Sequence, residues 1–112
     1  MIDDVIIAAR KEVPGTGEDL VNSIIISLGT FNSEKGFSSA SLSLTELSGK
    51  VGSQLRERGI EISPSDFSAA LDILNRFDIT VIKSHLAEED TIYSLSANGL
   101  AQYAITYEAE RV

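Results

Sequence analysis

Cysteine and tryptophan are absent from this 112-residue sequence, and only one histidine is present. Without cysteine, the chain has no disulfide framework, no thiolate metal site and no thiol nucleophile. Long apolar runs are also absent, since no segment approaches the roughly 20 apolar residues of a membrane-spanning helix. Asp3 and Asp4 lie where a signal peptide carries cations. These absences predict a soluble protein of the cytoplasm that does not associate with membranes.

Positive charge is scarce, because nine Lys and Arg residues face seventeen Asp and Glu residues and the formal net charge is −8. Proteins that coat nucleic acid without sequence preference usually carry a basic surplus, so this class is disfavoured. The hydrophobic content of 43% is close to that of folded globular proteins, which argues against disorder. A chain of this length supplies one hydrophobic core, so we predict a single domain over residues 1–112.

Two helices are predicted in the N-terminal third of the chain. Residues 2–13 place acidic side chains before an apolar run and basic side chains after it, as the helix dipole favours. A Pro-Gly pair ends this helix, and a second one carries a broad apolar face over residues 17–28. Gly29 is the expected stop of the second helix. Residues 30–43 are then predicted to form a surface loop that ends in a short strand at 40–42.

Three further helices are predicted to begin at serine caps. Ser43 precedes a helix that extends to about residue 58, as the apolar spacing after it indicates. Ser63 precedes a helix with Pro64 at its first position, where the missing N–H costs nothing. Ser96 precedes the last helix. Each start follows from a local hydrogen bond that the serine hydroxyl can accept.

A β-hairpin is predicted before the last helix. Residues 79–86 and 91–95 are rich in β-branched and aromatic side chains and flank an acidic tip. The order of elements is then helix, short strand, helix, helix, hairpin and helix, which is that of a winged helix-turn-helix domain. We therefore predict a mostly α fold of the α+β kind, with a helical core and a small antiparallel β-hairpin wing.

One segment carries a family resemblance. Tyr93-Ser94-Leu95-Ser96-Ala97-Asn98-Gly99 resembles the Tyr-x-Leu-Ser/Thr-x-x-Gly run that closes the wing in many winged-helix regulators, including the MarR and PadR groups. Leu42 to Leu47 similarly looks like the strand and helix opening before a helix-turn-helix, and Phe67 to Phe77 looks like a recognition helix. The resemblance covers residues 17–107, after a flanking helix at 1–15. It implies a transcriptional regulator that binds duplex DNA as a homodimer.

The implied DNA interface would use polar side chains of the fourth helix in the groove and cations on the phosphates. The groove candidates are Ser65, Ser68, Asn75 and Arg76, and the phosphate candidates are Lys50, Arg56, Arg58 and Lys83. Cations spread along an amphipathic helix are equally well explained as its solvated face. Both interpretations stay open at the level of sequence.

A protein partner is the alternative. Five carboxylates occupy the helix face and the wing tip that a DNA reader would use, namely Asp66, Asp72, Glu88, Glu89 and Asp90. Carboxylates repel phosphates and attract a basic protein, so the domain could instead be an acidic adaptor or inhibitor that binds no DNA. The plainer explanation is that these carboxylates only confer solubility.

Motifs for catalysis are absent. The sequence has no Gly-rich phosphate loop, no paired zinc histidines and no nucleophile elbow. His85 lies near the acidic tip, but one imidazole beside flexible carboxylates lacks the ligand count of a zinc site. We therefore predict that the protein is not an enzyme and has no metal or cofactor.

The first and last helices hold more apolar residues than a domain of this size needs to bury. The candidate dimer contacts are Val5, Ile6, Tyr103 and Tyr107. The competing explanation is that the two helices are covered within one chain.

Overall fold

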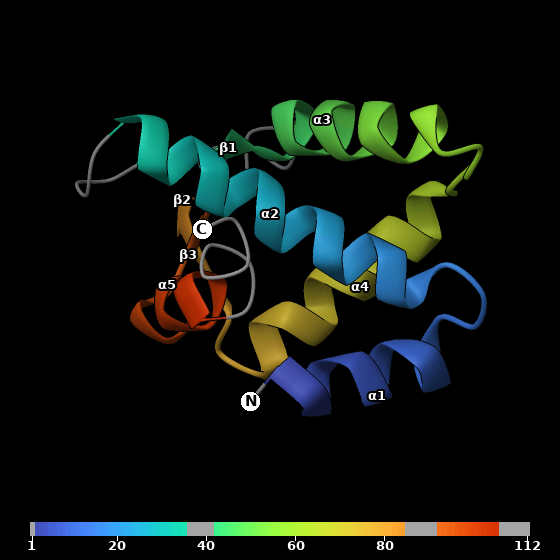
Figure 1. Cartoon of the computed structure of the whole chain (residues 1–112), viewed down its shortest axis with the longest axis horizontal. Coiled ribbons are helices and arrows are strands. Elements are labelled where there is room, and N and C mark those ends of the chain that lie inside the picture. The colour runs from blue at the N-terminus through green and yellow to red at the C-terminus, as the bar shows by residue number, and fades with distance from the viewer. Residues whose placement is uncertain (1, 36–41, 85–91, 106–112) are drawn as a thin grey trace.

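Helices dominate the computed structural model, which describes residues 2–35, 42–84 and 92–105, with the side chains of residues 3–30, 42–80 and 92–105. Within these ranges the chain forms five helices and three short strands (Figure 1). In chain order they are α1 (Ile2–Glu12), α2 (Gly17–Lys35), β1 (Leu42–Ser43), α3 (Leu44–Glu57), α4 (Pro64–Arg76), β2 (Thr80–Ser84), β3 (Ile92–Leu95) and α5 (Ala97–Tyr103). The coarse prediction of a mostly helical fold with a small antiparallel sheet is confirmed. No helix in the described ranges is long and apolar enough to cross a membrane.

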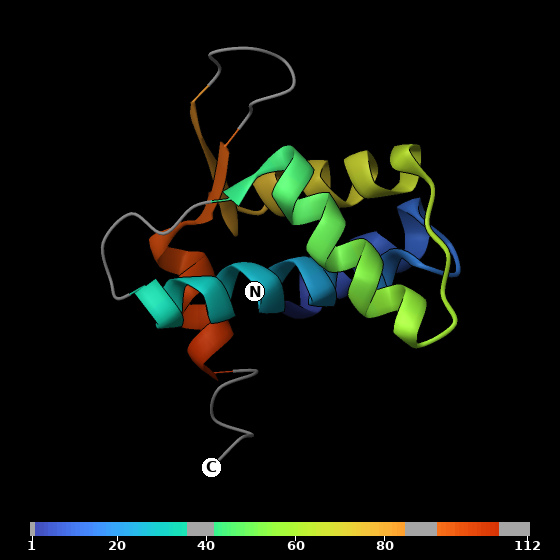
Figure 2. The same ribbon diagram turned by 90° about the horizontal axis from the view of Figure 1, so that it is seen from above.

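The helix α2 lies at the centre of the fold and contacts α1, α3, α4 and α5. Figure 2 shows α3 crossing α2 on the side nearest the viewer, and α1 and α4 lie farther from the viewer than α3. The apolar face of α2 is almost completely buried, and it consists of Leu20, Val21, Ile24, Ile25 and Leu28. Burial of each large aliphatic side chain contributes about 1.5–3 kcal/mol. The other helices are therefore positioned mainly by their packing on α2.

A pair of hydrogen bonds fixes α3 on α2. Ser23 Oγ donates to Gln54 Oε1 over 2.6 Å, and Gln54 Nε2 donates to Ser27 Oγ over 3.0 Å. Both serines are buried, so their hydroxyls would lack partners without Gln54. The glutamine thus links α3 to two positions of α2 that lie one turn apart.

The three strands form one antiparallel sheet in the order β1-β3-β2. Leu42 pairs with Tyr93 on one side of β3, and Ile82 pairs with Tyr93 on the other. The register shifts between Ile82 and Ser84, as at a β-bulge. The hairpin predicted from the β-branched residues is present, and the short strand before α3 joins it as a third member.

The helix α2 does not stop at Gly29, and this corrects the sequence prediction. It continues to Lys35, so part of the expected loop is helical. Gly29 faces the ring of Tyr103, and a Cβ at residue 29 would overlap that ring. The glycine is thus required for close packing of α5 on α2, and helix termination has no part in it.

The serine caps are confirmed at Ser43, Ser63 and Ser96, each of which accepts a hydrogen bond from the backbone N–H three residues later. The start of α2 differs. The hydroxyl of Thr16, which precedes Gly17, is buried without a hydrogen-bond partner in the described structure. The helix therefore begins where the sequence predicts, but no hydrogen bond to the Thr16 hydroxyl caps it.

The C-terminal end of α4 is joined tightly to α5. Asp78 adopts the left-handed conformation with φ of 57°, which lets the N–H of Ile79 bond the carbonyl of Leu74 over 2.9 Å. The carbonyl of Asp78 in turn accepts a hydrogen bond from the hydroxyl of Ser96. Gly99 is packed so closely that a Cβ there would overlap the carbonyl oxygen of Ile79.

Candidate functional site

The helix α4 places one face in the core and the opposite face in solvent. Ser63 accepts from the N–H of Asp66 over 3.2 Å, and Pro64 stands at the first helical position. The buried face consists of Phe67, Ala70, Leu71, Ile73 and Leu74. The exposed stripe consists of Ser65, Ser68, Asp72, Asn75 and Arg76. All four residues predicted to contact the groove therefore lie on the exposed stripe.

The four groove candidates differ in how far they are already bonded. Ser65 Oγ lies 3.1 Å from Ser63 Oγ at the helix start, and both are exposed. Ser68 is exposed as well. Asn75 Oδ1 accepts a hydrogen bond from Thr80 Oγ1 over 3.1 Å, which ties the end of α4 to β2. The serines are therefore the more available pair for a partner.

Arg76 is held by two carboxylates. Its Nη2 atom lies 2.7 Å from Glu12 Oε1, its Nη1 atom donates to Glu12 Oε2 over 3.1 Å, and Asp72 Oδ2 lies 3.3 Å from Nη2. The hydrogen bond from Arg76 lowers the pKa of Glu12, and the carboxylate of Glu12 raises the pKa of Arg76. The guanidinium therefore ties α4 to α1, and its charge is already compensated where DNA would need it.

Arg58 is also paired within the chain. Its Nη2 atom lies 3.2 Å from Asp19 Oδ1, which links the residue after α3 to the start of α2. The pair is largely exposed and contributes little to stability, but it neutralises the charge locally. A phosphate contact by Arg58 would have to replace this pair.

Lys50 and Arg56 are exposed and form no ion pair among the side chains that the structure describes. Six positions separate them on α3, and each residue turns a helix by about 100°, so they project about 120° apart. The phosphate candidates therefore do not gather on one described surface. Among these candidates Arg58 is bound by a carboxylate, and Lys50 and Arg56, which have no described ion-pair partner, diverge.

The remaining sequence candidates at the hairpin are only partly described. Lys83 belongs to β2, but its side chain lies outside the described set. His85, Glu88, Glu89 and Asp90 lie outside the described residues altogether. Of the acidic alternative, Asp66 and Asp72 remain, and both belong to α4.

Two of the four dimer candidates are covered within the chain itself. Val5 is 0% exposed and Tyr103 is 4% exposed, so both belong to the chain's own core and offer nothing to a second copy. Ile6 is partly buried against the same core, and Tyr107 lies outside the described residues. The competing explanation, burial within one chain, holds for Val5 and Tyr103. A homodimer therefore stays a prediction.

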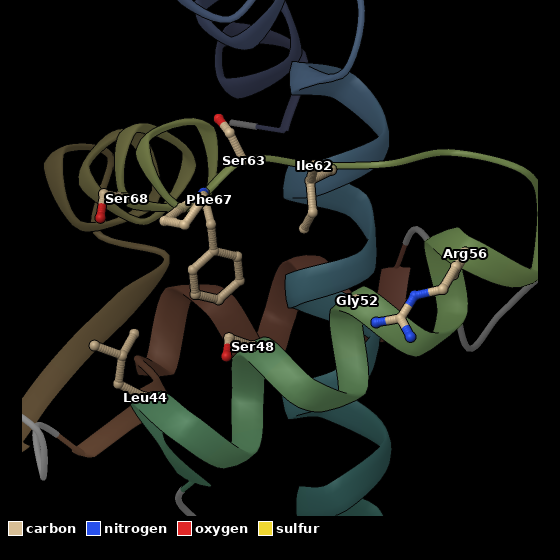
Figure 3. A pocket seen from close by; sticks show the side chains of 9 residues that line it. Leu44, Ser48, Gly52, Arg56, Ile62, Ser63, Phe67 and Ser68 are labelled. Carbon is tan, nitrogen blue, oxygen red and sulfur yellow. The ribbon is translucent and has the colours of Figure 1, made fainter.

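Sequence reasoning missed a cleft between α3 and the start of α4 (Figure 3). It has a volume of about 340 Å³. One wall follows every fourth residue of α3, and the other follows the link and first turns of α4, with the lining residues Leu44, Ser48, Gly52, Arg56, Ile62, Ser63, Pro64, Phe67 and Ser68. The four-residue spacing in α3 was visible in the sequence, but its opposite wall depends on how the two helices cross.

Chemistry of other kinds is not brought together. Within the described part of the chain, no three His, Asp or Glu side chains gather as a metal would require. No family model, no curated protein and no solved structure matches this chain. The features of the described structure that a partner could use are therefore the exposed face of α4, Lys50 and Arg56 of α3, and the cleft between these helices.

Proposed function

We propose that this chain is a winged helix-turn-helix domain that binds duplex DNA and regulates transcription. The observation that carries the proposal is the arrangement of elements. The helices α3 and α4 are followed by the β2–β3 hairpin, and β3 lies between β2 and the short strand β1. In a helix-turn-helix, the second helix of such a pair enters the major groove. In this proposal, α4 is that second helix.

The exposed start of α4 suits contact with base edges. Ser65 and Ser68 are short, and a hydroxyl both donates and accepts hydrogen bonds, so it can bond either kind of base edge. The link between the two helices, residues 58–63, is longer than the usual turn of three or four residues. Gly59 accommodates it with φ of 77°. The longer link sets the distance of α4 from α3 and so its approach to the groove.

The cation count makes a quantitative prediction. If Lys50 and Arg56 both reach phosphates although they project about 120° apart on α3, the logarithm of the binding constant falls with the logarithm of salt concentration at a slope of about −1.8 per chain. The test is selection from a random duplex library at low salt, followed by a fluorescence anisotropy salt series on the selected sequence. Lys50→Gln and Arg56→Gln are each expected to reduce the slope by about 0.9.

Arg58→Gln is the matched control, because Arg58 is already paired with Asp19 and its removal should change the slope less. Binding of no duplex at the lowest salt, by protein whose circular dichroism shows an intact fold, would overturn the proposal. Equal slopes for the parent and both α3 variants would overturn the assignment of phosphate contacts while leaving DNA binding in place.

A basic protein partner is the second candidate, and the bound state of Arg76 favours it. With that guanidinium held by Glu12, α4 presents Asp66 and Asp72 and no uncompensated cation among its described side chains. Asp72→Asn separates the two candidates. It removes a charge that repels phosphates and so strengthens DNA binding, whereas it weakens binding of a lysine-rich peptide.

A further inference from the structure

The cleft between α3 and α4 has an apolar floor. Phe67 projects from α4 toward α3, and Leu44 and Ile62 lie at either side of its ring (Figure 3). Phe67 is only 5% exposed, while Leu44 and Ile62 are partly buried. Gly52 leaves the middle of the α3 wall without a side chain, so the hollow stays open above this floor.

The charge of the lining is positive, which is unusual on a chain with a net charge of −8. Arg56 is the one ionisable residue among the nine that line the cleft. Its guanidinium turns back along α3 toward Gly52, where a Cβ would lie 3.6 Å from Nη2 (Figure 3). Arg56 makes no ion pair with a described side chain, so no described carboxylate competes with an anion for its guanidinium.

A carboxylate limits the site on one side. A smaller adjoining hollow of about 240 Å³ shares Gly52, Arg56 and Ile62 with the cleft and has Glu61 at its edge. Glu61 would repel a second negative charge on anything bound to Arg56. The charges therefore favour a ligand with a single acid group.

We propose that this cleft binds a small organic monoanion, with its acid group on Arg56 and its apolar body against Leu44, Ile62 and Phe67. The volume of about 340 Å³ lies near the lower end of small-molecule sites, which suits a body of one aromatic ring or one branched aliphatic group. A carboxylate accepts two parallel hydrogen bonds from a guanidinium, and these are stronger than bonds between neutral groups. The site does not depend on DNA binding.

Phenylacetate is a suitable probe, and phenylacetamide is its neutral counterpart of the same shape. We expect phenylacetate to shift the amide resonances of the cleft residues in ¹H–¹⁵N NMR titration and to saturate. Phenylacetamide should bind about tenfold more weakly, because it lacks the charge that Arg56 recognises. Arg56→Gln should reduce the affinity for phenylacetate to that of the amide. Glu61→Gln should strengthen it.

Two further variants separate the cleft from general charge effects. Lys50→Gln removes the same charge from the same helix outside the cleft and should leave the affinity unchanged. Gly52→Leu fills the hollow and replaces a poor helix former, so the fold is kept while both probes lose binding. Absence of saturable shifts, shifts scattered over the surface, or equal losses in Lys50→Gln and Arg56→Gln would each overturn the proposal. No DNA is present in the titration, so its outcome is separate from that of the proposed function.

Discussion

The two ends of α4 differ in how much of their bonding capacity the fold already uses. At the C-terminal end, Arg76 is held by Glu12, and the carbonyl of Asp78 accepts from Ser96. At the N-terminal end, the helix borders an open cleft in which Arg56 has no ion-pair partner among the described residues. The C-terminal end thus serves to hold the helix in place. The N-terminal end keeps the groups that a partner or ligand could use.

The largest effect of a single substitution is expected at Gly99. A Cβ there would overlap the carbonyl oxygen of Ile79, so Gly99→Ala pushes α5 away from the segment that follows α4. This substitution should lower the free energy of unfolding by about 3 kcal/mol. Gly49→Ala is the control, because nothing lies within 4 Å of its added Cβ and it should gain up to about 1 kcal/mol. Urea unfolding measures both. Equal midpoints would show that the junction is not tight.

Ser96→Ala comes next. The hydroxyl caps α5 through the N–H of Gly99 and donates to the carbonyl of Asp78, so its loss should cost about 1–2 kcal/mol. At the opposite end, Ser65→Ala removes an exposed hydroxyl that touches only Ser63 Oγ and should change stability by less than about 0.5 kcal/mol. A larger loss of stability in Ser65→Ala than in Ser96→Ala would contradict the proposed contrast between the two ends of α4.

Asp78→Gly should stabilise the protein by up to about 1 kcal/mol, because φ of 57° is costly for a residue with a Cβ. The hydrogen bonds at this position use the main-chain carbonyl, which glycine retains. Thermal unfolding by differential scanning calorimetry measures the gain. A decrease in Tm would mean that the carboxylate of Asp78 stabilises the turn.

Glu12→Gln is expected to have the smallest effect and one that depends on pH. Arg76 lowers the pKa of Glu12 below its ordinary value of 4.5, so the unfolded chain binds this proton more readily. The stabilisation is complete above about pH 4.5 and is lost as the pH falls through the folded-state pKa. The variant should therefore be less stable than the parent at pH 7 and equal to it in strong acid. A constant difference across the titration would contradict the assignment.

Local features of the fold were readable from the sequence. The caps at Ser43, Ser63 and Ser96 depend on a hydroxyl and an N–H three residues later, so the sequence contains all that is needed. The prediction of a helix stop at Gly29 is wrong, because the role of this glycine is not local. Its role depends on Tyr103, which is distant in the chain, and glycine near a helix end is also the usual sign of a stop.

The candidate site was less predictable than the fold. The stripe on α4 followed from helical spacing, but the pairing of Arg76 with Glu12 joins residues of different helices and has no local signal. The burial of Val5 and Tyr103 likewise depends on how α1 and α5 pack. Charge counts along a sequence therefore overstate the cations that are available to a partner.

Because Gly29 contacts the ring of Tyr103, the residue type at one of these positions restricts the residue type at the other. No side chain fits at residue 29 while a tyrosine stands at residue 103, and a smaller residue at 103 leaves a void unless residue 29 becomes larger. Single exchanges at either position are therefore disfavoured, whereas a paired exchange can conserve the total volume. In related chains we expect these two positions to vary together.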